Sequence, residues 1–152
     1  MKKIYERNIN SNVHQLGPNR ILTEASLLDL NHNMHVELEI NTSTRVIEKA
    51  RAFIQKAPLK ICDTTTDLMQ GLEGQKIERG INRALLKVLG HSDGCTHLYE
   101  LALNAVRLSY NVMIGMNFNW KEWLSKSLDD EKFIKAAKPY LKNACRPFHE
   151  DK

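Results

Sequence analysis

Residues 34–40 have the sequence MHVELEI, in which apolar and polar side chains alternate without a break. Successive side chains of a β-strand point to opposite faces of the sheet, so this segment predicts a strand with one buried and one polar face. Such a strand needs partners. Residues 21–30 follow a Gly-Pro-Asn turn signal and are rich in aliphatic side chains. The short link at 31–33 predicts that the two segments form a hairpin.

Two further segments are candidates for the same sheet. The apolar side chains Ile4, Tyr5 and Ile9 predict an edge strand near the start of the chain. Residues 45–56 are compatible with two structures. Their apolar positions fit a helical stripe, but they also follow a turn-forming NTST segment, as the partner strand of a hairpin would. The pattern alone leaves both structures open.

From residue 61 onward the apolar positions recur with a helical period. Five helices are expected, at about 63–74, 75–90, 95–108, 120–127 and 130–144, the last of them kinked at Pro139. Strands followed by helices predict an α+β fold. In this fold an antiparallel sheet of three or four strands would have four or five helices packed on one face.

Size and composition are ordinary for one globular domain, with 152 residues, 42% of them hydrophobic and 26% charged. No window approaches the roughly 18 apolar residues of a membrane helix, and no apolar stretch of a signal peptide follows the basic start. The net charge of +4 is small, and acidic residues lie among the C-terminal lysines, as is typical of a solvated helix face. We therefore expect a cytoplasmic protein with neither nucleic acid nor membrane as a partner.

The chain lacks the sequence fingerprints of several common catalytic sites, including GxGxxG, the Walker A loop, HExxH, CxxC and GxSxG. No paired general acid and base is evident either, so no catalytic residue is predicted. The three cysteines are too few for a disulfide framework, and their number is odd. In a reducing compartment they are expected to be free thiols or metal ligands.

Four side chains that bind soft or borderline metals lie at the ends of predicted elements, namely His32, Cys62, Cys95 and His97. A thiol at a helix N-terminus is favoured as the thiolate, which is the form that binds metal. If these elements converge, two sulfurs and one or two nitrogens suit Zn²⁺ or an iron–sulfur centre. Two carboxylates, Asp29 and Asp63, are candidates for oxygen ligands or for groups that orient His32.

The same residues also have an ordinary structural interpretation. A single cysteine near an apolar helix is more often a small buried hydrophobe than a ligand. A single histidine at a turn is more often a surface or capping residue. Because the four candidates lie far apart in the sequence, their convergence depends on the fold and not on their spacing.

Three stretches occur in a characteristic order: VIEKARAF at 46–53, CDTTTDLMQGLEGQ at 62–75 and GCTHLYELA at 94–102. Through them, residues 34–110 resemble the NifU/IscU-type scaffold domain (SufE/NifU superfamily) of iron–sulfur cluster assembly. The resemblance implies that residues 45–54 form a strand. It also implies a site for zinc or an iron–sulfur cluster.

The resemblance assigns roles to single residues. Cys62 falls on the second cluster cysteine of the scaffold and Cys95 on its third. The first cysteine has no match, and His32 could supply the missing ligand. The histidine that often precedes the third cysteine is Gly94 here, with His97 one helical turn away as a substitute.

The chain departs from the scaffold pattern at two places. The proline-rich stretch that the family's chaperone binds is replaced by GHSD at 90–93, which argues against chaperone-assisted cluster transfer. Cys145 lies in a C-terminal extension, where it is either a fourth ligand or an ordinary thiol. We expect a NifU/IscU-like α+β domain at 1–118 and a helical extension at 119–152 packed on the same domain.

The whole chain is also similar to a bacterial family that has no assigned activity. The similarity rests on DLNH at 29–32, the lone Cys62, and a Gly-Cys-Thr-His-Leu signature at 94–98. It implies no substrate.

The function predicted first is therefore a metal-binding, scaffold-like protein that works with a protein partner, either a larger enzyme or assembly machinery. The second is a non-catalytic accessory subunit of a larger oxidoreductase or acyl-CoA-type enzyme complex, for which aromatic side chains near the C-terminus would serve as anchors. The third is a metal-dependent enzyme of unknown substrate. Homo-oligomer formation is left open.

Overall fold

The structure is a computed structural model that describes residues 1–116 and 129–150. The chain divides into two compact units, Met1–Tyr110 and Asn111–Lys152, and each is described by itself. The predicted boundary at residue 118 lies outside the described residues and stays a prediction.

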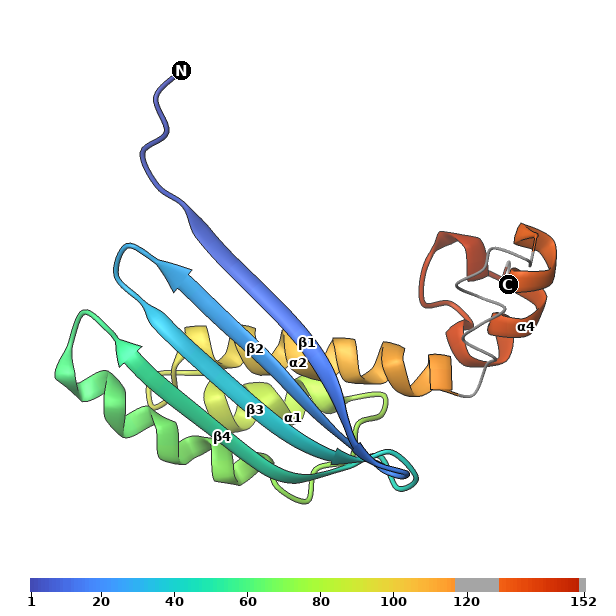
Figure 1. The fold of residues 1–152 in the computed structure, drawn as a ribbon, viewed down its shortest axis with the longest axis horizontal. Coiled ribbons are helices and arrows are strands. Elements are labelled where there is room, and N and C mark those ends of the chain that lie inside the picture. Colours follow the sequence, from blue (N-terminus) through green and yellow to red (C-terminus); the bar gives the residue numbers. More distant parts are fainter. Residues whose placement is uncertain (117–128, 151–152) are drawn as a thin grey trace. The chain divides into compact units, whose positions relative to one another are not determined.

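The first unit contains an antiparallel sheet whose strand order follows the chain, β1-β2-β3-β4 (Figure 1). The strands are β1 (Arg7–Gly17), β2 (Arg20–Asp29), β3 (Asn33–Asn41) and β4 (Val46–Lys56). The predicted hairpin of β2 and β3 is confirmed. Residues 46–56 form a strand, so the helical alternative for this segment was wrong. The edge strand begins at Arg7, after Ile4 and Tyr5.

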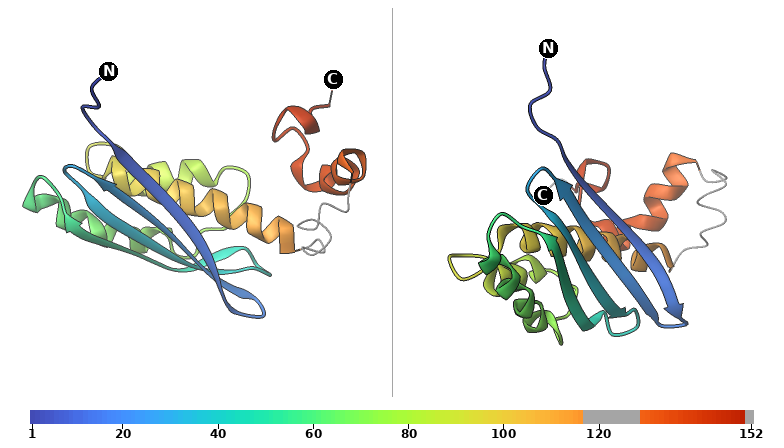
Figure 2. Two further views of the ribbon diagram at one scale, coloured as in Figure 1. Left: turned by 45° about the horizontal axis from the view of Figure 1, so that its top comes forward. Right: turned by 60° about the vertical axis from the view of Figure 1, so that its left-hand side comes forward.

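The two faces of the sheet differ in chemistry because the side chains alternate. The face toward the helices carries side chains that are almost completely buried: Ile21, Thr23, Ala25, Leu27, Met34, Val36, Leu38, Ile40, Ile47 and Ala50. The opposite face, called the open face below, carries charged and polar side chains that include Glu24, His35, Glu37 and Glu39. No helix of residues 1–110 covers the open face (Figure 2).

Three helical segments follow the sheet and lie against its apolar face: η1 (Lys60–Leu72), α1 (Ile81–Leu89) and α2 (Thr96–Met116). Each contributes a stripe of buried side chains to the core, among them Met69, Leu72, Leu85, Leu89, Leu98 and Leu101. The α+β fold predicted from the order of the elements is therefore confirmed. None of the helices described is long and apolar enough to span a membrane.

The first helical segment is a 3₁₀-helix where an ordinary helix was predicted. Three successive threonines lie in its first half. Each hydroxyl donates to the carbonyl three residues earlier: Thr64 to Ile61, Thr65 to Cys62 and Thr66 to Asp63, at 2.7 to 2.8 Å. Such bonds occur in both kinds of helix, so the sequence pattern did not distinguish the two.

The next helix begins at Ile81, whereas the sequence predicted a start near Gln75. Residues 73–77 are instead paired with the start of β4. The amide of Ile47 donates to Gln75 O at 2.9 Å, and Gly74 N donates to Ile47 O at 2.9 Å. An isolated bridge joins Val46 and Lys76. The apolar position Ile77 therefore belongs to this extended segment and not to the helix.

A buried pair of hydroxyls joins α2 to the sheet. Ser109 Oγ lies 2.8 Å from Thr23 Oγ1 and 2.7 Å from Ala105 O, and both hydroxyl side chains are fully buried. The hydroxyl of Ser109 can donate to Ala105 O while the hydroxyl of Thr23 donates to Ser109 Oγ, so both hydroxyls have a hydrogen-bond partner. Buried hydroxyls need such partners, and this pair fixes the position of α2 over β2.

The second unit contains α4 (Asp130–Leu141) and η2 (Arg146–Phe148). Asp129 caps α4, since its carboxylate accepts from Lys132 N at 2.8 Å. Pro139 lies inside the helix as predicted, and the helix ends at Leu141, three residues earlier than expected. The helix predicted at 120–127 lies outside the described residues.

Gly94 is expected to tolerate no side chain, because the loop before α2 folds tightly onto the end of α1. A Cβ at this position would lie 2.1 Å from Leu89 O and 2.4 Å from Gly90 O. Gly94→Ala should lower the free energy of unfolding by about 2 kcal/mol or more. Gly17→Ala, where nothing lies within 4 Å, should change it by less than about 0.5 kcal/mol. Urea denaturation measures both values, and similar values for the two variants would contradict the prediction.

Candidate functional site

The candidate site begins with the carboxylate of Asp29, which closes the turn between β2 and β3. Its Oδ1 accepts hydrogen bonds from Asn31 N and His32 N, both at 2.8 Å, and lies 3.0 Å from His32 Nδ1. The side chain of Asp29 is fully buried. This turn holds His32 at the end of the sheet, with its Nδ1 toward the carboxylate.

The other oxygen of Asp29 binds the guanidinium of Arg7, the first residue of β1. Arg7 Nε and Nη2 both lie 2.8 Å from Asp29 Oδ2. The register places Arg7 directly opposite Asp29 in the β1–β2 pair. Arg7 also reaches α2, where its Nη1 lies 3.6 Å from Glu100 Oε2. One guanidinium therefore connects β1, β2 and α2.

A second imidazole lies against His32. The ring centroids of His32 and His97 are 4.0 Å apart and the rings are tilted by 40°. His97 stands in the first turn of α2, and its Nε2 lies 3.2 Å from Arg7 Nη2. Since a guanidinium only donates, Nε2 of His97 is the acceptor in this contact. We call Arg7, Asp29, His32, His97 and Glu100 the corner cluster.

The electrostatics of the corner cluster favour an ionised Asp29 and a neutral His97. Burial alone would raise the pKa of Asp29, but hydrogen bonds from Asn31, His32 and Arg7 outweigh it and lower that pKa well below its ordinary 3.8. Burial lowers the pKa of His97 below its ordinary 6.5, and the nearby His32 and Arg7 lower it further. His97 is therefore neutral at physiological pH, the form in which an imidazole binds metal or accepts a proton.

The two predicted cysteine ligands lie at the starts of helical segments, as expected, and both are partly buried free thiols. Cys62 is in the first turn of η1, and its N–H donates to Leu59 O at 3.1 Å. Cys95 precedes α2, where its carbonyl accepts from Tyr99 N at 2.9 Å. Asp63 is exposed beside Cys62 and lines a hollow of about 330 Å³ at the end of β4. Cys145 is an exposed thiol of the second unit.

The predicted ligands are brought together only in part. Within residues 1–116 and 129–150, one trio of histidine, cysteine or carboxylate side chains has its ligand atoms within 4.8 Å of one another, and it is Glu24, His35 and Glu37. The predicted set contributes the adjacent pair His32 and His97, with Asp29 against His32. A complete metal site made of these residues stays a prediction.

Sequence reasoning missed two members of the corner cluster. Arg7 gave no signal, because its role depends on the register that places it opposite Asp29. Glu100 lies within the stretch GCTHLYELA but was not identified as a site residue. The Glu24, His35 and Glu37 trio was also missed. Its signal was present in the alternation of β2 and β3, which predicts that the three side chains share the polar face.

Asp29→Asn is expected to destabilise the protein in a pH-dependent manner. The amide oxygen of asparagine can still accept from the two turn amides, but the negative charge opposite Arg7 is lost. Because the pKa of Asp29 is lowered by folding, its contribution is complete above pH 3.8 and is lost as the pH falls below that value. The wild type should therefore be the more stable protein at pH 7, and the difference should shrink below pH 4.

Urea denaturation at several pH values measures this difference. Asp67→Asn is the matched control, because Asp67 is exposed on η1, and this variant should differ little from the wild type at any pH. A difference between Asp29→Asn and the wild type that stays constant down to pH 2 would show that the carboxylate charge contributes nothing.

Comparison with known proteins gives a single result. A family model described as a protein of unknown function (DUF2889) matches residues 11–126, which is more than half of the chain. No curated protein and no solved structure matches the chain. The resemblance to the NifU/IscU scaffold therefore stays a prediction. The chain belongs to the DUF2889 family.

Proposed function

We propose that this chain is a cytoplasmic metal-binding protein that holds one transition-metal ion at the corner cluster, with His32 and His97 as ligands. Zn²⁺ is the ion that this donor set suits best, because imidazole and thiolate are its usual ligands. The iron–sulfur alternative relies mainly on cysteines and has less support from a pair of histidines. The resemblance to a cluster-assembly scaffold supports the same class of function.

The observation that carries the proposal is the arrangement of Asp29, His32 and His97. In zinc proteins a histidine ligand commonly donates its second ring N–H to a carboxylate, which fixes the tautomer and orients the ring. Asp29 occupies that position, 3.0 Å from His32 Nδ1. Nε2 of His32 is then the nitrogen available for a ligand, and the neutral imidazole of His97 lies beside it.

The cysteines would complete the ligand set. Cys95 is two residues before His97, immediately before the start of α2, and a cysteine sulfur is a usual zinc ligand. Cys62, at the start of η1, is the further candidate. Arg7 opposes metal binding at His97, because its guanidinium donates to Nε2 of that ring. This contact must break when His97 binds the metal. If Nε2 is the ligand, the metal uses the lone pair that accepts from Arg7. If Nδ1 is the ligand, Nε2 carries the ring proton and can no longer accept from Arg7.

The contact between Arg7 and His97 also supports a second candidate function, an enzyme that uses the corner cluster for proton transfer. A histidine whose Nδ1 is held by a buried carboxylate can serve as a general base through Nε2. Burial and the permanent cation of Arg7 keep the imidazole of His97 neutral without needing a metal. No substrate follows from this arrangement.

Metal analysis of protein purified without oxygen or chelator tests the first proposal. We expect one equivalent of zinc at the corner cluster of the wild type and loss of that equivalent in His97→Gln and in Cys95→Ser, because each variant removes one donor. His91→Asn is the matched control, since His91 is an exposed imidazole whose positive φ of 64° asparagine also tolerates. Its metal content should equal that of the wild type.

Three results would contradict the zinc proposal. Iron with sulfide-to-iron absorption bands would indicate a cluster in place of zinc. Equal loss of zinc in His91→Asn would show that the metal is bound nonspecifically. Absence of metal in repeated preparations that also fail to take up added Zn²⁺ would leave the proton-transfer candidate.

Arg7→Gln separates the two candidates. If the corner cluster binds metal, removing the cation should tighten Zn²⁺ binding, because the guanidinium competes for His97 Nε2 and repels the ion. Isothermal titration of the metal-free protein measures the affinity. Weaker binding in Arg7→Gln than in the wild type, with the fold intact by circular dichroism, would place the metal away from His97.

A further inference from the structure

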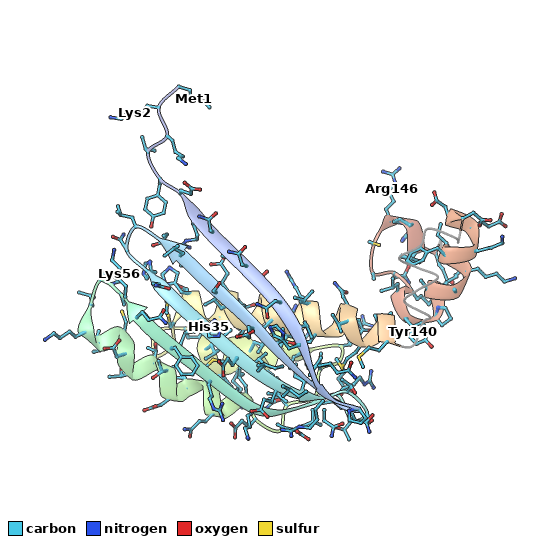
Figure 3. All side chains as sticks on the ribbon, viewed as in Figure 1. Met1, Lys2, His35, Lys56, Tyr140 and Arg146 are labelled. Carbon is cyan, nitrogen blue, oxygen red and sulfur yellow. The ribbon has the colours of Figure 1, made fainter. Side chains whose placement is uncertain are left out.

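A second group of potential ligands lies on the open face of the sheet, apart from the corner cluster. His35 Nε2 is 3.3 Å from Glu24 Oε1 and 3.5 Å from Glu37 Oε1. One ligand atom from each of these residues lies within 4.8 Å of the other two, and all three side chains are about three-quarters buried. His35 stands on β3 near the middle of the sheet (Figure 3).

The register of the sheet brings two carboxylates together here. Glu24 on β2 is directly opposite Glu37 on β3 in the antiparallel pair. Like charges at directly opposed positions of two strands destabilise the pair. A cation between the two carboxylates would remove that cost, and the imidazole of His35 already stands there.

The partners of Glu24 differ from those of its neighbour Glu39. Glu39 lies within ion-pair distance of three permanent cations, Arg20, Lys49 and Arg51. In the described part of the chain, the ion-pair partners of Glu24 are two histidines, His35 at 3.3 Å and His14 at 3.0 Å. Within residues 1–116 and 129–150, Glu24 thus has no permanent cation as a partner, although the same face provides several.

We propose that Glu24, His35 and Glu37 bind a divalent transition-metal ion on the open face of the sheet, with Zn²⁺ as the ion to test. One imidazole nitrogen and two carboxylate oxygens are ligands that Zn²⁺ accepts, and three protein ligands leave a fourth position open. His14 binds the second oxygen of Glu24 and so orients that carboxylate, as outer groups do around metal ligands. Arg51, 3.7 Å from Glu37 Oε2, balances part of the remaining charge.

This site is separate from the proposed corner site, so the two proposals can be tested independently of each other. Glu24 and Asp29 lie on opposite faces of β2, because five positions separate them along an alternating strand. The test therefore uses full-length protein with the corner site disabled by His97→Gln, so that any remaining stoichiometric Zn²⁺ is bound elsewhere.

Isothermal titration with Zn²⁺ measures binding in this background. We expect one equivalent, and we expect His35→Gln or Glu24→Gln to weaken it more than tenfold. Replacing an orienting group typically weakens metal binding by about ten- to a hundredfold, so His14→Gln should also weaken it by about tenfold. Backbone amide NMR shifts on addition of Zn²⁺ should be largest at residues 24, 35 and 37.

Glu39→Gln is the matched control, since it removes a carboxylate from the same strand and the same face, outside the trio. It should leave the Zn²⁺ affinity unchanged. Equal affinity in His35→Gln and its parent would overturn the proposal. So would equal weakening in Glu39→Gln, or no saturable binding up to millimolar Zn²⁺. Circular dichroism of each variant confirms that the sheet is intact.

Discussion

The buried charge of Asp29 is the constraint around which the end of the sheet is organised. An ionised carboxylate without solvent is stable only when hydrogen bonds and an opposite charge compensate it. Asp29 has both, from two turn amides, the ring of His32 and the guanidinium of Arg7. These partners come from β1 and from the β2–β3 turn, and Arg7 extends the network to His97 and Glu100 on α2. The position of the two imidazoles thus depends on one carboxylate.

The alternation of β2 and β3 separates two kinds of chemistry. On the helix side, apolar side chains and the buried hydroxyl pair of Thr23 and Ser109 form the core, and the carboxylate of Asp29 is compensated by its own network. On the open side, solvent lowers the cost of charge, so acidic and basic side chains collect there and balance one another. Most pairs on that face follow this rule. The opposed carboxylates of Glu24 and Glu37 follow it least, since the partners of Glu24 among the described residues are the imidazoles of His14 and His35.

The sequence pattern predicted correctly those elements whose structure depends on neighbouring residues. It failed where a contact with a distant part of the sequence determines the structure. MHVELEI was identified as a strand because a period of two permits little else. VIEKARAF fits both a helix and a strand. It forms a strand because it pairs with β3, and this pairing cannot be read from the segment itself. Residues 75–77 continue a helical pattern, yet their hydrogen bonds go to the start of β4. The threonines at 64–66 favour a helix start as well as the 3₁₀ form observed.

The same distinction between local and distant contacts applies to the residues of the candidate site. His32 and His97 were identified because each stands at the end of an element, where side chains of different segments meet. Asp29 was identified as a carboxylate that could bind metal or orient His32. Arg7 was not, because nothing near it in the sequence shows that the strand pairs it with Asp29. An arginine at that point changes the chemistry, since it occupies one nitrogen of His97 before any ligand arrives.

Arg7 would therefore make the proposed metal binding at the corner a competition between two cations. Without a metal, the guanidinium of Arg7 at the corner lies within ion-pair distance of two carboxylates, Asp29 and Glu100. A divalent ion that displaces Arg7 from His97 need not remove it from Asp29, because the two contacts use different acceptors. The guanidinium can stay bound to the carboxylate while the imidazole turns toward the metal. The hydrogen bonds of Asp29 with Arg7 and His32 can therefore remain after Arg7 has left Nε2 of His97.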